Sequence, residues 1–112
     1  MNTVPLPAAT ALAVDAIEEL ARGEWTRLTA RFDPVMRERL SDDALAAAWA
    51  HIVAQGGAYE RHGEPEAVRA ADLTITNTPL AFEADDFIAR ITFRDNRTIA
   101  GLYILPVTKG SS

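Results

Sequence analysis

Two histidines are the side chains in this sequence that titrate nearest to neutral pH. His51 lies about 130° from the centre of an apolar stripe of Leu45, Trp49 and Ile52 if each residue turns a helix by about 100°. We therefore predict that His51 lies on the surface. His62, in the segment YERHGEP, is expected on the surface at the end of a strand, although loops there can carry function. No acidic residues accompany the histidines at ligand spacing, so we predict no metal site.

Four polar side chains are the candidates for general acid–base or oxyanion chemistry: Tyr59, His62, Tyr103 and Asp33. No acid–base pair among them can be placed together from the sequence. The more favoured role for Asp33, in the segment FDP, is to cap a helix or shape a turn. Ser41 has no GxSxG elbow and is predicted to be a helix N-cap. The sequence also lacks the GxGxxG and P-loop motifs, and we assign no cofactor.

Aromatic residues are the stronger group for binding an apolar molecule. Where helices and a sheet enclose a cavity, aromatic side chains with polar tips can line it, because each tip needs a partner when buried. The alternative is that they belong to the core, and for Phe32, Phe82 and Phe93 the core is favoured. The candidate ligand-binding residues are Trp25, Trp49, Tyr59, Phe82 and Tyr103.

The composition is that of an ordinary globular domain. Of the 112 residues, 48% are hydrophobic and 24% are charged, which predicts a single domain with one core, the ends at 1–8 and 107–112 being expected to fray. A net charge of −5 without a basic run argues against nucleic-acid binding. The sequence has no apolar run of transmembrane length and no signal peptide, so we expect no membrane partner and a cytoplasmic location. It also has no cysteine.

The first half of the chain has a helical period. One apolar stripe follows Thr10, a candidate N-cap, and a helix there should end at Gly23. A short helix is expected from Trp25 to the FDP segment, with one or two further turns in VMRERL. Another helix should begin after Ser41 and end at the glycines at 56–57.

The second half alternates as strands do. AYERH is a candidate edge strand, LTITNTPLAFEA a strand interrupted near Pro79, and GEPEAVRAAD a solvated segment. DFIARITF should turn Phe87, Ala89, Ile91 and Phe93 toward the helices, with Arg90 on the opposite face. Helices followed by about four antiparallel strands predict an α+β domain with the helices packed on the sheet.

The order of these elements also carries a resemblance to a known family. The segments are LARGEWTRLTARFDPVMRERLS, LAAAWAHIVAQGGAY and PLAFEADDFIARITFRDNRTIAGLYILP. They resemble the small DUF3887-type domains of the NTF2-like (cystatin-like) superfamily. The resemblance implies a curved sheet wrapped around helices with a cavity between them, and homodimers packed through the sheet. It also implies relatives that are polyketide cyclases, isomerases, dehydratases or binding modules, or domains attached to α/β-hydrolases.

Two features depart from that family. Such domains commonly have Asp-Gly in the last turn, where this chain has Asn96-Arg97. Either Arg97 adopts the left-handed conformation that favours glycine, at a cost of about 1 kcal/mol, or Asn96 does so and the register shifts. The Asp/His acid–base pair of the catalytic relatives is also missing, which leaves enzymatic activity open.

A three-residue turn there pairs Phe93 with Ile99, Ile91 with Gly101, and Ala89 with Tyr103. Leu102 and Ile104 would then point outward beside Ile88, and an uncovered apolar patch of this kind favours association. We therefore predict a homodimer that packs through Ile88, Leu102 and Ile104.

The leading hypothesis is a module that binds an apolar small molecule between helices and sheet and dimerises through the sheet. The alternatives are a small cofactor-independent enzyme of the cyclase, isomerase or hydrolase type, and an accessory domain that partners a hydrolase.

Overall fold

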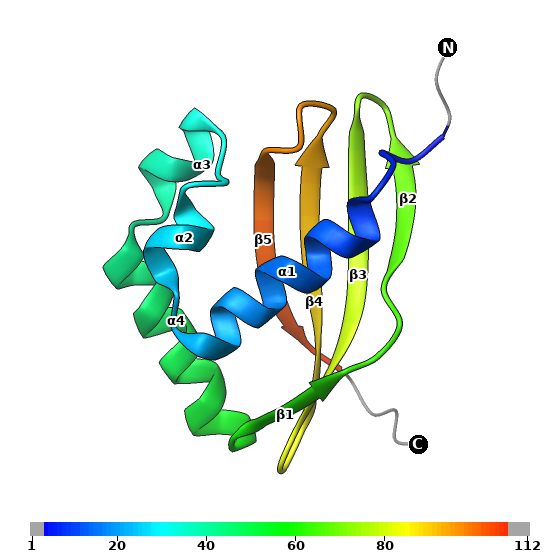
Figure 1. The fold of residues 1–112 in the computed structure, drawn as a ribbon. Helices are drawn as coiled ribbons and strands as arrows, with labels where there is room; N and C mark the ends of the chain where they lie inside the picture. Colours follow the sequence, from blue (N-terminus) through cyan, green and yellow to red (C-terminus); the bar gives the residue numbers. More distant parts are fainter. Residues whose placement is uncertain (1–3, 108–112) are drawn as a thin grey trace.

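The computed structural model describes residues 4–107, and they form an α+β domain, as predicted (Figure 1). Four helices come first: α1 (Ala9–Arg22), α2 (Trp25–Thr29), α3 (Pro34–Arg39) and α4 (Asp42–Gly56). Five strands follow: β1 (Tyr59–His62), β2 (Glu66–Ala70), β3 (Leu73–Phe82), β4 (Asp86–Arg94) and β5 (Ile99–Pro106). No helix within the described residues is long and apolar enough to cross a membrane.

The helix ends follow their capping residues. The side chain of Ser41 accepts a hydrogen bond from Ala44 N, so its predicted role as the N-cap of α4 is confirmed. Asp33 caps α3 in the same way, and Gly23 ends α1 with a φ of 73°. Thr10 was wrongly predicted as the cap of α1, because the helix begins two residues earlier than such a cap requires, with Ala8 at the N-cap position.

The sheet is antiparallel, with β1 and β2 both pairing with β3, and β4 and β5 following in order. The predicted interruption of β3 near Pro79 is wrong, because β3 pairs with β4 without a break from Leu73 to Ala81. Pro79 lies instead opposite the break between β1 and β2, where Gly63 donates to its carbonyl oxygen. A proline has no N–H to donate, so its partner strand is the one that is interrupted. The segment expected to be solvated contains the missed fifth strand, β2.

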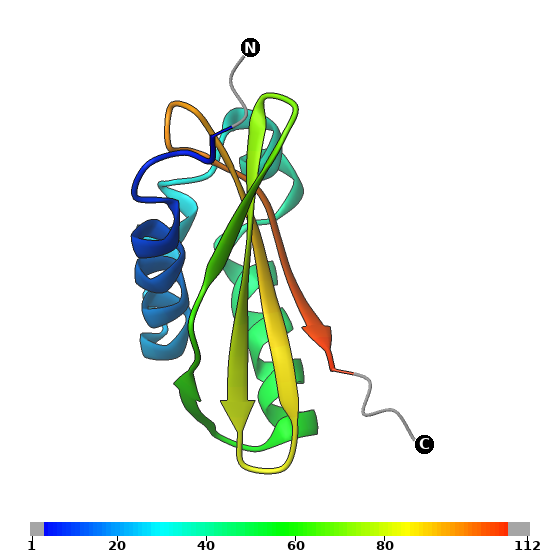
Figure 2. The same cartoon turned by 90° about the vertical axis from the view of Figure 1, so that its right-hand side faces the viewer.

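One face of the sheet is packed against α1 (Figure 2). The predicted inward face of β4 is confirmed, since its four alternating apolar residues are all at most 3% exposed: Phe87, Ala89, Ile91 and Phe93. On β3 the same face carries three threonines with 0% exposure: Thr74, Thr76 and Thr78. The hydroxyl of Thr74 accepts a hydrogen bond from Leu6 N at 2.8 Å, which ties part of the segment expected to fray, residues 1–8, to the sheet. Residues 1–3 and 108–112 lie outside the described part.

A β-bulge changes the direction of the last strand. Of the two alternatives for the turn, the structure has Arg97 in the left-handed conformation, with a φ of 74°, and Phe93 pairs with Ile99 as predicted. Ala100 is then an extra residue, because Thr92 pairs with Gly101 rather than with Ala100. One extra residue in a strand exchanges the two faces for every residue that follows.

The predicted pairing beyond this point is therefore wrong by one residue. Ile91 pairs with Leu102, and Ala89 with Ile104, so both β5 side chains turn toward the helices and not outward. Tyr103 pairs with Arg90, faces outward and is 59% exposed. Gly101 also faces outward rather than into the core, and the ring of Tyr103 lies beside it.

Candidate functional site

The candidate site is an apolar cleft between α4 and β5, closed at one end by α1. Its volume is about 280 Å³. The residues that line it are almost all aliphatic or aromatic: Leu20, Leu40, Leu45, Ala48, Trp49, His51, Ile52, Leu102 and Ile104. An apolar concave surface with few polar groups is the usual form of a small-molecule site.

The cleft exists because α4 packs loosely. Leu45 and Gly56 are the residues of α4 that are buried, whereas Trp49 and Ile52 are half-buried on the side that faces β5. Figure 1 shows α4 standing beside the edge of the sheet at β5, while α1 lies across its face. The space between α4 and β5 is therefore bridged by side chains only in part.

A cluster of aromatic rings supports one wall of the cleft. The ring of Trp49 lies 5.5 Å from that of Phe82 and 6.0 Å from that of Tyr59, measured between centroids. Phe82 also contacts Phe87 edge-on at 5.1 Å. These separations are those of packed aromatic pairs. Trp49 is thus held from behind by rings of the sheet.

The five predicted ligand-binding residues separate in the structure. Trp49 lines the cleft, and Tyr59 and Phe82 lie behind it in the aromatic cluster. Trp25 packs at the end of α1, near Gly23, and does not line the cleft. Tyr103 lies on the outer face of the sheet.

Most of the lining was missed at the level of the sequence. Leu45, Trp49 and Ile52 form the apolar stripe that was predicted for α4, and this signal could have identified them as a group. Leu102 and Ile104 were assigned to the wrong face, since the bulge at Ala100 has no clear signature in the sequence. His51 is exposed, as predicted, and also borders the cleft.

The four candidates for acid–base chemistry are not brought together. Tyr59 and His62 lie on β1, at the opposite side of the sheet from β5, which carries Tyr103 on its outer face. The His62 ring nitrogen Nδ1 is 2.9 Å from the carbonyl oxygen of Gly63. Burial, with a smaller contribution from the charge of Glu18, raises the pKa of Tyr59.

Asp33 is occupied by structural contacts. Its carboxylate accepts a hydrogen bond from Arg94 Nε at 2.7 Å and one from Met36 N at 2.7 Å. The hydrogen bond from Arg94, followed by that from Met36, lowers the pKa of Asp33 below its ordinary value. A carboxylate held in its charged form in this way is poorly suited to donate a proton.

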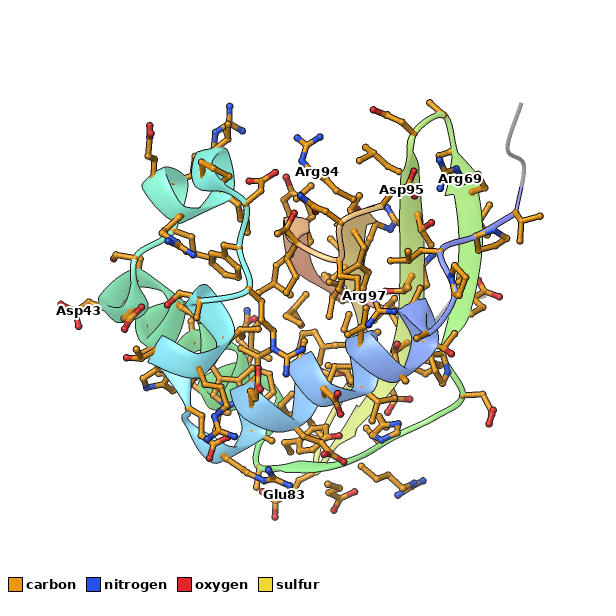
Figure 3. The ribbon with its side chains drawn as sticks, turned by 45° about the horizontal axis from the view of Figure 1, so that its top comes forward. Asp43, Arg69, Glu83, Arg94, Asp95 and Arg97 are labelled. Atoms are coloured by element: carbon orange, nitrogen blue, oxygen red, sulfur yellow. The ribbon has the colours of Figure 1, made fainter. Side chains whose placement is uncertain are left out.

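Polar contacts hold the helices around the cleft. Asp42, at the start of α4, accepts hydrogen bonds of 2.6 Å from the hydroxyls of both Thr26 and Thr29. These contacts, that of Thr26 first, lower the pKa of Asp42. At the end of the sheet that carries the β2–β3 and β4–β5 turns, Arg69 binds Asp95 through two hydrogen bonds of 2.6 and 3.0 Å (Figure 3). These contacts fix the helices and turns while leaving the cleft lining apolar.

The fold and the cleft define a small α+β protein with helices beside and across an antiparallel sheet and an open apolar site between them. The chain belongs to a family described as proteins of unknown function (DUF3887), whose model matches residues 13–102. No curated protein and no solved structure matches the chain.

Proposed function

We propose that this protein is an NTF2-like module that binds an apolar small molecule in the cleft between α4 and β5. The observation that carries the proposal is the lining, in which aliphatic and aromatic side chains from α1, α4 and β5 converge with His51 as the one titratable group. Apolar surface of this kind gains free energy when a ligand removes it from water, at about 25 cal/mol per Å².

The size of the cleft restricts the ligand. Small-molecule sites are commonly about 300–1,000 Å³, so a cleft of about 280 Å³ suits a small ligand or part of a larger one. The separation of the four acid–base candidates, Tyr59, His62, Tyr103 and Asp33, supports binding over catalysis. No feature of residues 4–107 favours a role as partner of a hydrolase.

The test uses the two tryptophans of the chain as matched reporters. Apolar acids of increasing length are titrated while fluorescence and thermal unfolding are recorded. The Trp25→Phe variant should keep the ligand-induced change, because Trp25 does not line the cleft, whereas Trp49→Phe should lose it. No change in fluorescence or unfolding with any apolar acid would refute the binding of a free apolar acid in the cleft.

We also propose that the protein forms a homodimer through the outer face of the sheet. This face keeps Ile88 from the predicted interface, whereas Leu102 and Ile104 face the cleft and do not belong to it. Val68 and Tyr103 are 54% and 59% exposed on the same face. The apolar residues that share it are Val68, Ile75, Ile88, Tyr103 and Leu105. An exposed apolar surface of several residues favours association.

Two valines of equal exposure provide the test of the dimer. Val68 lies on the outer face and Val35 lies on α3, and each is 54% exposed. Val68→Lys should shift the protein from dimer to monomer in size-exclusion chromatography with light scattering, and Val35→Lys should leave the dimer intact. A wild-type protein that is monomeric at micromolar concentration would contradict the proposal.

A further inference from the structure

The edge of β5 beside the cleft carries unpaired backbone groups. In an antiparallel pair, alternate residues direct N–H and C=O toward the partner strand and the others direct them away. Val107 N donates to Asp86 O at 3.2 Å, so Leu105 and Tyr103, which follow at two-residue intervals, are the residues that bond to β4. Within residues 4–107, two residues of β5 therefore present both N–H and C=O to the free edge: Leu102 and Ile104.

The same edge already accepts an extended segment at its start. Ile99 N donates to Arg31 O at 2.8 Å, and Asp33 N donates to Ile99 O at 2.9 Å, so Phe32 forms a parallel bridge with Ile99. The chain then leaves the edge, because Asp33 begins α3. The row of hydrogen bonds that residues 31–33 begin is thus left open at Leu102 and Ile104.

The open part of the row faces the cleft. Leu102 and Ile104 both line the cleft. Figure 1 shows α3 and α4 beyond the free edge of β5, on the side away from β4. Figure 2, seen from the opposite edge of the sheet, places α4 behind the strands, which agrees with this position. The two helices stand beside this edge and would obstruct the sheet of a second copy.

Pro106 fits this arrangement. It follows Ile104 by two residues, so its nitrogen also points to the free edge, where no bond to β4 is lost. The free edge of β5 therefore has no N–H donor at Pro106. The donors for a ligand are limited to the stretch that borders the cleft.

We propose that the ligand of the cleft is an extended peptide segment that pairs with Leu102 and Ile104 as an added strand. This inference rests on the proposed binding function and narrows its ligand. Because side chains alternate along a strand, every second residue of the segment would place an apolar side chain between Leu45, Trp49 and Ile52. The backbone of the segment would exchange hydrogen bonds with the edge at intervals of about 6.8 Å, which is two residues of an antiparallel strand.

A capped tetrapeptide, acetyl-Leu-Thr-Leu-Thr-amide, tests the proposal together with two analogues. Each analogue carries N-methyl groups on alternate residues, and alternate amides of a strand point to opposite edges. The analogue whose methylated amides point away from β5 should bind as the parent peptide does. The analogue whose methylated amides point toward β5 should bind at least about tenfold more weakly, because it cannot donate hydrogen bonds to the strand. Binding is followed by fluorescence of Trp49 in a Trp25→Phe background and by the amide resonances of Leu102 and Ile104.

Changes in the protein provide an independent arm. Ile104→Pro removes the outward N–H, whereas Ile104→Ala removes a comparable amount of side chain and keeps it. Parent peptide should bind the proline variant about tenfold more weakly than the alanine variant. Circular dichroism checks that both variants are folded, and the methylated peptides decide the question if the proline variant is not.

The outcomes distinguish this inference from the function on which it rests. Equal binding of both methylated peptides would overturn the use of the edge. Binding of decanoic acid without binding of the peptide would also overturn it, and would leave the proposed apolar site standing. Binding of neither probe would overturn both proposals.

Discussion

Two helices of nearly equal length meet the sheet in different ways. α1 has 14 residues and buries Ala9, Ala13, Ala16, Ile17 and Leu20 to 2% exposure or less. α4 has 15 residues, yet Leu45 is its one large side chain that is buried. α1 lies across the face of the sheet, and α4 stands beside the edge of β5.

The difference shows that the size and position of the side chains decide whether a helix packs fully against the sheet or leaves a cleft beside it. Alanines allow α1 to approach β3 closely, and its two large buried side chains, Ile17 and Leu20, complete the packed face. α4 presents Trp49 and Ile52, which reach the strands only in part and leave the cleft between them. Polar contacts at its start, from Thr26 and Thr29 to Asp42, compensate for the weaker packing.

The largest expected effect compares one isoleucine from each helix. Ile17→Ala on α1 should lower the free energy of unfolding by about 2–5 kcal/mol, because a fully buried side chain leaves a cavity. Ile52→Ala on α4 should cost less than about 1 kcal/mol, since Ile52 is half-exposed at the cleft. Urea unfolding measures both, and equal losses would show that the two contacts are equally tight.

A second pair adds volume instead of removing it. Ala13→Leu should destabilise the fold by about 1–3 kcal/mol, because α1 has no free space against the sheet. Ala48→Leu, on the cleft wall, should leave stability nearly unchanged and abolish ligand binding. Unfolding curves and ligand titrations of the two variants test this, and a strongly destabilised Ala48→Leu protein would mean that the cleft is closed in solution.

The third prediction concerns the polar contacts of Asp33 at the start of α3. Asp33→Ala should cost about 1 kcal/mol more than Asp33→Asn, because asparagine can still cap α3 while both lose the ion pair with Arg94. Thermal unfolding of the two variants compares them. If they were equally stable, the cap would contribute nothing.

The pH dependence of stability around α3 and α4 follows from the direction of the pKa shifts of Asp33 and Asp42. The folded-state pKa values of Asp33 and Asp42 are lowered from 3.8, by Arg94 and by Thr26 respectively as the leading causes. Their stabilisation is therefore present above pH 3.8 and is lost as the pH falls below it. Amide hydrogen exchange in acid should accelerate in α4 before α1, and Arg94→Gln should move the pKa of Asp33 back toward 3.8 in an NMR titration.

The smallest expected effect is a gain in stability at the β4–β5 turn, which lies outside both α1 and α4. Arg97 holds a φ of 74°, and its neighbour Asn96 accepts hydrogen bonds from the N–H and hydroxyl of Thr98 at 3.1 and 2.6 Å. Arg97→Gly should stabilise the turn by up to about 1 kcal/mol, because glycine adopts this conformation without strain. A lower melting temperature for this variant would contradict the assignment of strain to Arg97.

Local chemistry made much of the fold predictable. The caps at Ser41 and Asp33, the stop at Gly23 and the alternation of β4 depend on neighbouring residues, and the structure confirms them. β2 was not predicted, because its sequence EAVRA has no clear alternation of apolar and polar residues. Its edge position beside β3 is set by the tertiary arrangement.

The site was predictable in outline only. The apolar stripe of α4 indicated a surface for the cleft, and Trp49 was identified as a candidate. Leu102 and Ile104 were not, because their direction depends on how Ala100 is accommodated opposite Thr92. That choice is made by the pairing of two strands and not by the residues of β5 alone.

The bulge at Ala100 decides which side chains of β5 face the cleft and which face outward. Deleting Ala100 would remove the extra residue and keep the pairing of Thr92 with Gly101 and of Ile91 with Leu102, so both faces of β5 would be preserved. Pairing Ala100 with Thr92 without a bulge would instead exchange the faces, so that Tyr103 would enter the cleft while Leu102 and Ile104 would join the outer surface. An alignment gap at this position is therefore compatible with the same aliphatic cleft, whereas a substitution that abolished the bulge would change the chemistry of the cleft.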